Sequence, residues 1–309
     1  MLSVTQNIRM ADIEQILKDH IKVEVASENK KTVTKLREEV VAAAMEELKK
    51  ARPIVVKRPN GKKSEVTLAH EMTEPVLSYI SGRIPLLLVG PAGSGKTYIA
   101  INVAKLLDLP YYSISVNEQT SKSDFLGYKD ANGKLVETNF RKAYEHGGVF
   151  IIDEIDAGNP NILTVVNSAL SNDTCPFPDG MVTRHPDFVA VCTANTFGEG
   201  ESLQYIGRNI LDAATKDRFA SMYIDYSDTL EAVLVPTYRN LLIELRAHFK
   251  KNNVLTVIST RSGLRLERIR DAKDFVDYED LVSCLNMQQE VLRDSQVVNI
   301  IKKYVAVPA

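Results

Sequence analysis

The sequence feature that most restricts the fold of this 309-residue chain is an eight-residue run, Gly90-Pro91-Ala92-Gly93-Ser94-Gly95-Lys96-Thr97. It fits the pattern G-x-x-x-x-G-K-[ST] of a phosphate-binding loop, or P-loop. The apolar run 84–89 precedes it, as is typical of a buried strand in a parallel sheet. Apolar residues then recur at helical spacing, at Ala100, Val103, Ala104 and Leu107. This strand–loop–helix order predicts an α/β fold and disfavours a glycine-rich turn with a chance lysine.

The residue types in this run explain how such a loop holds a nucleotide. Glycines let the backbone approach phosphate oxygens closely, and the following helix directs its free N–H groups and positive dipole end at them. Lys96 can reach the β and γ phosphates, while Thr97 offers a hydroxyl to Mg²⁺. The run 90–97 is therefore predicted to bind a nucleoside triphosphate together with Mg²⁺.

A second motif lies at the end of another predicted strand. Four apolar residues, 149–152, precede Asp153 and Glu154. Ligands of open α/β sheets bind at the carboxyl ends of the strands, so both acids are expected beside the phosphates. We expect Asp153 to hold Mg²⁺ and Glu154 to polarise the attacking water. Many strands end in acidic turns, and the pattern gains its specificity by following a P-loop.

A third predicted strand, 188–193, continues into Ala194 and Asn195. An asparagine at this strand end can orient the water beside the γ-phosphate, so Asn195 is a candidate catalytic residue. Judged alone, it is equally well a turn-forming asparagine. The residue itself does not decide between the catalytic and the turn-forming interpretation.

Composition places the chain among ordinary globular proteins. Hydrophobic residues make up 44% and charged residues 25%, and a formal net charge of −2 argues against a basic protein that coats nucleic acid. Cys175, Cys192 and Cys284 lack metal-site spacing and are expected to be reduced thiols. No apolar stretch approaches the length of about 18 residues that marks a membrane helix, and the first residues lack the design of a signal peptide. A soluble, cytoplasmic protein without membrane contact is expected.

Three segments are expected along the chain: a helical segment with a β-hairpin at residues 1–69, the α/β domain at 70–228, and a helical domain at 229–309. In the first segment, 1–27 and 28–52 have helical spacing, and the second stretch is either a solvated helix or a partner-binding arm. Its hairpin is predicted from Asn60-Gly61 between two β-prone runs.

Two further turns are expected to carry contacts with a partner. Asn132-Gly133 predicts a hairpin, and the segment 176–180 predicts a turn that faces outward. Phe177 is either an exposed aromatic that contacts the partner or a residue tucked under its own turn.

The three strand-end motifs together resemble those of the AAA+ ATPases. The segments 153–160 and 193–200 are similar to the MoxR and dynein-related branch, and within it to the cobaltochelatase small-subunit (CobS-like) type. The segments 126–134 and 205–219 fit the same pattern. The resemblance covers roughly residues 70–225 well and the C-terminal part loosely, and it does not extend to residues 1–65.

This resemblance implies a five-stranded parallel sheet flanked by helices, a helical lid after it, and a ring, usually of six subunits, with ATP between neighbours. By motif position, Asn195 corresponds to the sensor that orients water and Arg218 to the arginine finger that completes the adjacent subunit's site. A surface pair of Arg218 with Asp217 is an equal alternative from residue pattern alone. Arg208 is a second candidate finger, and Arg261 corresponds to a lid residue that contacts ATP in cis.

Two functions follow from the resemblance. The first is a ring ATPase that uses ATP hydrolysis to remodel or assemble a partner protein, which in these branches is often a von Willebrand A-domain protein. The second is an ATP-driven nucleic-acid motor or loader, for which Lys129, Lys134 and Arg184 lie on predicted hairpins. The near-neutral charge and the lack of a recognisable nucleic-acid-binding module favour the first. Cobalt chelation is one narrow version of the first function. A third possibility, a scaffold that binds nucleotide without turnover, is disfavoured because Asp153, Glu154 and Asn195 are all present.

Overall fold

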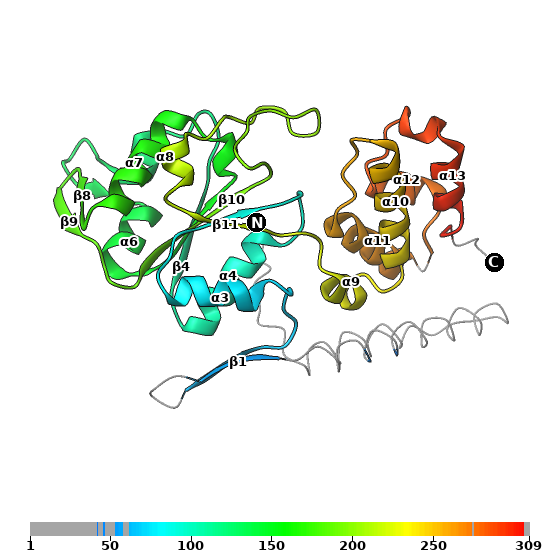
Figure 1. Ribbon diagram of the computed structural model, residues 1–309, viewed down its shortest axis with the longest axis horizontal. Helices are drawn as coiled ribbons and strands as arrows, with labels where there is room; N and C mark the ends of the chain where they lie inside the picture. The colour runs from blue at the N-terminus through cyan, green and yellow to red at the C-terminus, as the bar shows by residue number, and fades with distance from the viewer. Residues whose placement is uncertain (1–41, 43–45, 47–52, 58–61, 274, 306–309) are drawn as a thin grey trace. The chain divides into compact units, whose positions relative to one another are not determined.

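The computed structural model describes residues 42, 46, 53–57, 62–273 and 275–305 (Figure 1). The chain divides into two compact units. The sheet unit contains Val55–Glu65 and His70–Asp225, and the helical unit contains Val66–Ala69 and residues 226–305. The helices expected over 1–27 and 28–52 lie outside the described residues, apart from Ala42 and Glu46, which are helical.

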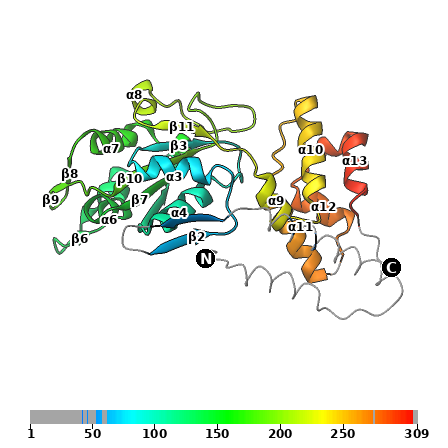
Figure 2. The same ribbon diagram turned by 60° about the horizontal axis from the view of Figure 1, so that its bottom comes forward.

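A five-stranded sheet forms the centre of the sheet unit (Figure 2). Its strands are β3 (Leu86–Val89), β4 (Tyr111–Ser115), β7 (Gly148–Asp153), β10 (Phe188–Ala194) and β11 (Ala220–Tyr223). Their order is β11-β3-β10-β7-β4, and every pairing is parallel. The register places Val89 beside both Ala194 and Tyr223, so the central strands end at the same edge. The expected five-stranded parallel sheet is confirmed.

Apolar side chains build a core on each face of this sheet, because successive residues of a strand point to opposite faces. Leu86 and Leu88 belong to the core that contains α3 (Thr73–Ser81) and α4 (Lys96–Leu107). Leu87 and Val89 belong to the opposite core, which contains α5 (Lys122–Leu126), α6 (Asn139–His146) and α7 (Pro160–Ser171). Both faces of the central strands β3, β7 and β10 are covered, so these strands are nearly continuous buried runs, whereas the edge strands β4 and β11 are partly exposed.

Three further pairs of short strands lie outside the central sheet. β5 (Tyr128–Lys129) and β6 (Leu135–Val136) pair antiparallel on either side of Asn132-Gly133, as predicted. β8 (Thr174–Phe177) and β9 (Gly180–Thr183) pair antiparallel as well. β1 (Ile54–Lys57) and β2 (Lys63–Val66) form a separate two-stranded sheet, while the predicted turn between them, Asn60-Gly61, lies outside the described residues.

Phe177 at the end of β8 is buried, so of its two open interpretations the residue tucked under its own turn is correct and the exposed, partner-contacting aromatic is wrong. Its side chain is 6% exposed, its ring centroid lies 5.8 Å from that of Phe140, and the guanidinium of Arg141 lies over the ring at 4.6 Å. Cys175 and Val182 of the same hairpin are in the same core. The β8–β9 hairpin is therefore part of the fold, because burial of an aromatic ring gains more than exposure at a turn.

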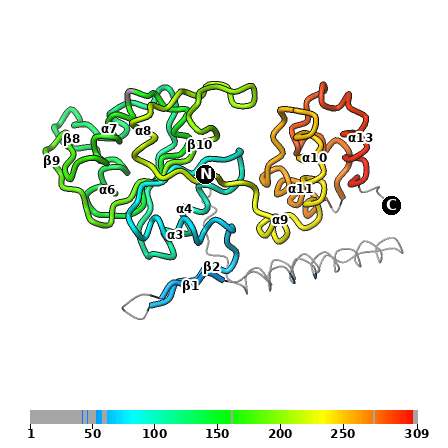
Figure 3. The backbone as a smooth tube through the Cα atoms, in the orientation of Figure 1, coloured from blue at the N-terminus to red at the C-terminus, as the bar shows by residue number. Residues whose placement is uncertain are grey.

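The helices of the helical unit pack around an apolar core. Their backbone can be followed from yellow to red in Figure 3. Gly263 allows close packing there, because a Cβ at this position would overlap the side chain of Val235. None of the described helices is long and apolar enough to cross a membrane. The helices are α9 (Asp228–Leu234), α10 (Arg239–Asn252), α11 (Thr260–Lys273), α12 (Tyr278–Cys284) and α13 (Ser295–Lys302), with a 3₁₀ turn η2 (Val291–Arg293) before the last.

All three cysteines are free and buried, as the expectation of unpaired thiols required. Burial raises the pKa of the Cys175 thiol to about 11 and also raises the pKa values of Cys192 and Cys284. These thiols behave as small core residues rather than as reactive groups.

Phe140 is the centre of an aromatic cluster and the position at which we predict a large loss of stability. Its ring centroid lies 5.2 Å from that of Phe150 and 5.7 Å from that of Tyr144, and the side chain is 2% exposed. Phe140→Ala should lower the free energy of unfolding by about 3–5 kcal/mol through lost burial and the cavity left behind. Chemical denaturation measures this, with exposed Tyr128→Ala as the control. A loss for Phe140→Ala no larger than that of the control would contradict the assigned core.

Candidate nucleotide site

The P-loop connects the end of β3 to the start of α4. Gly95 is the N-cap of α4 with φ of 97°, and Gly93 has φ of 76°, a region that glycine adopts readily. A Cβ at Gly90 would overlap the carbonyl oxygen of Ile224. The Ser94 hydroxyl is buried and has no hydrogen-bond partner among the described residues. Since phosphate oxygens would satisfy such a donor, the loop fits the predicted ligand.

Lys96 directs its ammonium group back at this loop. Its Nζ donates to the carbonyl oxygens of Gly90 at 2.7 Å and Pro91 at 2.9 Å, and to Asn195 Oδ1 at 3.1 Å. The side chain is 8% exposed, so the charge is largely removed from water. Two residues predicted for the site, Lys96 and Asn195, are thus in direct contact. A buried ammonium group here suits the recognition of phosphate.

Thr97 and Asp153, the two residues predicted to hold Mg²⁺, also lie together. Thr97 Oγ1 donates to Asp153 Oδ1 at 3.2 Å, and the hydroxyl of Thr193 donates to the same carboxylate oxygen. Hydroxyl and carboxylate oxygens are hard ligands of the kind that Mg²⁺ prefers. The donor set at the end of β7 and the start of α4 therefore fits this ion.

Glu154 follows β7 in the left-handed backbone region, with φ of 59° and ψ of 45°. Its amide donates to Thr193 Oγ1 at 3.2 Å, and its side chain is 49% exposed. Glu154 Oε2 accepts from both terminal nitrogens of Arg208, each at 3.4 Å. Because the Arg208 side chain is 13% exposed and occupied by acids of its own chain, the geometry argues against Arg208 as a finger that serves a neighbour.

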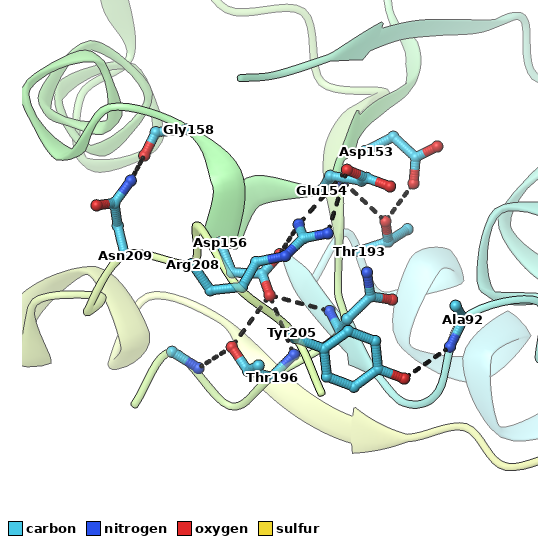
Figure 4. Close-up of polar contacts among 12 residues, drawn as sticks. Ala92, Asp153, Glu154, Asp156, Gly158, Thr193, Thr196, Tyr205, Arg208 and Asn209 are labelled. Carbon is cyan, nitrogen blue, oxygen red and sulfur yellow. Dashed lines mark hydrogen bonds and ion pairs between the residues drawn. The ribbon is translucent and has the colours of Figure 1, made fainter. Parts of the chain in front are cut away.

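Asp156 connects the acidic strand end to the segment that carries Asn195 (Figure 4). It lies in the short 3₁₀ helix η1 (Ile155–Ala157) and is 0% exposed. Its Oδ2 accepts from the backbone N–H groups of Asn195 and Thr196, both at 3.1 Å, and from Thr196 Oγ1 at 3.0 Å. Its Oδ1 accepts from Arg208 at 3.0 Å. A buried carboxylate requires such a set of donors, and this one fixes the position of Asn195.

The residues from Gly198 to Leu211 form a closed loop beside the site, called loop 198–211 from here on. Leu211 N donates to Gly198 O at 3.0 Å, and Glu199 and Ile210 form an antiparallel bridge at its base. Two of its side chains reach the site in Figure 4: Arg208 contacts the acids, and the Tyr205 hydroxyl accepts from the P-loop amide of Ala92 at 3.2 Å. This one loop contacts both halves of the site.

Arg218 and Arg261 have different surroundings. Arg218 follows α8 (Ala213–Lys216), and it donates through Nε to Ser171 Oγ at 3.0 Å and through Nη1 to the carbonyl oxygen of Ala214. Among the described residues, no ion pair joins Arg218 to Asp217. Arg261 is an exposed residue in the first turn of α11 in the helical unit. The predicted roles of both arginines in ATP hydrolysis stay predictions.

Sequence reasoning did not assign roles to Asp156, Thr193 and Tyr205. Asp156 belongs to the run Asp-Glu-Ile-Asp, where its carboxylate follows the strand end by three residues and returns to the same edge. Thr193 precedes the end of β10, as Asp153 ends β7, and the adjacent strands bring the two side chains together. The positions of Asp156 and Thr193 next to strand ends could therefore have identified them as site residues from the sequence. Tyr205 could not have been identified in this way, because no local sequence pattern connects it to the P-loop.

Comparisons with known proteins agree with this geometry. Residues 85–219 match the family model of the AAA domain (dynein-related subfamily). The chain is 25% identical over 221 residues to an uncharacterized protein of Staphylococcus epidermidis and 27% identical over 222 residues to one of Staphylococcus aureus, each match covering 67% of this chain and 81% of the relative.

One similar solved structure, from Cytophaga hutchinsonii, is described as a proposed ATPase; it has 16% sequence identity, a TM-score of 0.42, and coverage of 98% of this chain and 100% of that one. The fold assignment rests on the strand order and the site geometry. The family match covers the P-loop, both acids, Asn195 and Arg218. Residues 85–219 are therefore similar to the AAA domain of the dynein-related subfamily.

Proposed function

We propose that this protein binds ATP with Mg²⁺ and hydrolyses it, and that a ring of subunits uses the energy to remodel or assemble a partner protein. The observation that carries the first part is the convergence of Lys96, Thr97, Asp153, Glu154 and Asn195 at one edge of the sheet. These residues lie at the start of α4 and at or just after the ends of β7 and β10, and they supply the cation, metal ligands, carboxylate and amide that phosphoanhydride hydrolysis requires.

Each side chain has a defined task in this mechanism. Lys96 and the loop amides bind the phosphates, and Thr97 and Asp153 hold Mg²⁺, which supplies charge neutralisation at the phosphates. Glu154 takes up the proton of the attacking water as the water's oxygen bonds to the γ-phosphorus and the bond to the β-phosphate oxygen breaks. Asn195, held by Asp156, orients that water. Arg218 of a neighbouring subunit stabilises the charge on the transferred group.

The ring and the partner are proposed from Arg218 and from the sequence resemblance. A finger in trans is consistent with Arg218, which has no described hydrogen bond or ion pair to the P-loop of its own chain. A ring of six and a von Willebrand A-domain partner follow the resemblance to the MoxR and CobS-like branches. Cobalt chelation is not part of this proposal, and a cytoplasmic location is.

The purified chain should hydrolyse ATP in the presence of Mg²⁺, and single-stranded DNA should leave the rate unchanged. Phosphate release measured with and without DNA separates protein remodelling from a nucleic-acid motor, because a motor is stimulated by its track. A pull-down with the Glu154→Gln chain in ATP then tests for a protein partner. Absence of Mg²⁺-dependent hydrolysis at any protein concentration would overturn the proposal.

Lys96→Ala should weaken nucleotide binding by roughly 10- to 100-fold, the scale of hydrogen bonds made by a charged donor. The variant removes the ammonium group that bridges two P-loop carbonyls and Asn195. Titration with a fluorescent ATP analogue measures the change. Lys105→Ala, in the last turn of the same helix, is the control and should bind normally. Equal binding by both variants would show that Lys96 does not contact phosphate.

A further inference from the structure

Thr193 lies in the centre of the sheet, directly beside the end of β7. Its side chain is 1% exposed, and β10 pairs with β3 on one side and with β7 on the other. Cys192 lies beside Ile152 in this register, so the residues that follow them, Thr193 and Asp153, are neighbours on one face of the sheet. Because a β-branched side chain has few χ1 rotamers, the strand itself sets the direction of the Thr193 hydroxyl.

The Thr193 hydroxyl both donates and accepts a hydrogen bond at the candidate nucleotide site (Figure 4). Its proton is donated to Asp153 Oδ1, and its oxygen accepts the backbone N–H of Glu154 at 3.2 Å. The carboxylate of Glu154 takes part in neither bond. Thr193 therefore joins the ends of β7 and β10 and contacts a single carboxylate, that of Asp153.

The carboxylate of Asp153 is held through one of its two oxygens. Oδ1 accepts from Thr193 and, at 3.2 Å, from Thr97 Oγ1. Among the residues that the structure describes, no hydrogen bond reaches Oδ2. The χ2 torsion of an aspartate is broad, so a carboxylate with fewer donors takes up more orientations. The two hydroxyls together therefore determine which oxygen stays available to a cation, and this oxygen is Oδ2.

The two hydroxyls that hold Asp153 differ in their other tasks. Thr97 is itself a predicted ligand of Mg²⁺, so its oxygen is shared between the metal and Asp153. The oxygen of Thr193 is occupied by the Glu154 amide, which leaves its proton with one task, to hold Asp153. Groups that orient a metal ligand in this way contribute to metal affinity almost as strongly as the ligands themselves.

We propose that Thr193 is a positioning residue for the metal ion, whose hydroxyl holds Asp153 Oδ1 so that Oδ2 is presented to the Mg²⁺ that accompanies the nucleotide. This inference rests on the proposed ATPase function and deepens it, because it adds a residue that sets affinity for the metal rather than for the nucleotide. Lys96 and the P-loop amides bind the phosphates, and the single proton of Thr193 is already donated to Asp153. Loss of this hydroxyl should therefore weaken metal binding and spare metal-free nucleotide binding.

Thr193→Val is the selective test, because valine keeps the β-branched shape and replaces the hydroxyl with a methyl group. The probe is Mn²⁺, which takes the same kind of oxygen ligands as Mg²⁺ and is detected directly by electron paramagnetic resonance. With the chain in excess over ADP, the Kd for Mn²⁺ should rise about 10- to 100-fold, the scale for loss of a group that orients a metal ligand. The Kd for ADP in EDTA should stay at the parental value.

Two further variants locate the effect. Thr193→Ser restores the hydroxyl and should keep the Kd for Mn²⁺ close to the parental value. Thr183→Val, at an exposed threonine of β9, is the control for the substitution and should change neither Kd. A role of Thr193 confined to the stability of the sheet would lower the thermal-unfolding midpoint without changing the ratio of the two Kd values.

The outcomes separate this inference from the proposed function. A parental chain that binds neither ADP nor Mn²⁺ overturns the function itself. A parental chain that binds both, with Thr193→Val at the parental Kd for Mn²⁺, overturns the positioning role. Thr193→Val that weakens ADP binding in EDTA as much as Mn²⁺ binding also rejects it, because the substitution has then disturbed the P-loop. If Thr193→Val unfolds early, Thr193→Ala, which removes the hydroxyl with less bulk, is judged by the same two Kd values.

Discussion

Arg218→Ala is expected to bind ATP almost normally and to hydrolyse it on the order of 10³-fold more slowly, the scale associated with arginine fingers. The missing cation matters mainly in the transition state, where charge builds up on the transferred phosphoryl group. Among the described residues, the Arg218 side chain donates only to Ser171 and Ala214 of its own chain, so truncation removes little that the fold requires. The measurements are kcat by phosphate release and Kd by nucleotide titration, with exposed Arg268→Ala as the control.

A trans-acting Arg218 also predicts that activity per subunit rises with protein concentration, because each site is completed by a neighbour. Mixing Arg218→Ala with Glu154→Gln gives a sharper test. Each variant lacks a different half of the composite site, so some interfaces in mixed rings combine an intact Glu154 with an intact Arg218. Partial recovery of activity is expected. Two inactive variants that stay inactive in rings shown to be mixed would refute action in trans.

Glu154→Gln is expected to keep ATP binding and to lower kcat by about 10²–10⁴-fold, the contribution of a general base. The P-loop contacts of Lys96 and the pairing of Thr97 with Asp153 do not involve the Glu154 side chain, so the nucleotide and metal ligands survive. The amide cannot take a proton from water. A fluorescent-nucleotide titration together with phosphate release measures both parts.

Glu65→Gln, an exposed position on β2, is the matched control and should hydrolyse ATP at the parental rate. A Glu154→Gln variant that hydrolyses ATP near the parental rate would remove Glu154 from the mechanism. A variant that loses binding and hydrolysis together would instead assign Glu154 to the nucleotide or metal ligands. Only the split between binding and turnover supports the proposed base.

The strands, the P-loop helix and the main site residues could be predicted because their signals are local. Strands buried on both faces are apolar along their whole length, as in the run 149–152, and the residues at their ends share one edge of a parallel sheet. Lys96, Asp153 and Asn195 come together by this geometry alone. No pairing of particular side chains had to be known in advance.

The remainder depends on contacts that the local sequence does not specify. Tyr205 and Ala92 are 113 residues apart, and Arg208 and Asp156 are 52 apart, so their contacts follow from how loop 198–211 is anchored. The pairing of Arg208 with Glu154 in cis likewise depends on that anchoring. Phe177 was undecided for a related reason, since a turn aromatic is buried or exposed according to the core beneath it.

The buried cysteines have a practical consequence for spectroscopy. Thiol-reactive dyes attack the thiolate, and Cys175, Cys192 and Cys284 are at most 5% exposed with pKa values raised by burial. The three native thiols are therefore expected to react little with such dyes, so that labelling of the native chain is weak. A single cysteine introduced at Leu203, which is 85% exposed in loop 198–211, would carry a dye without removal of any native thiol. The emission of that dye would report whether the surroundings of loop 198–211 change as ATP is added.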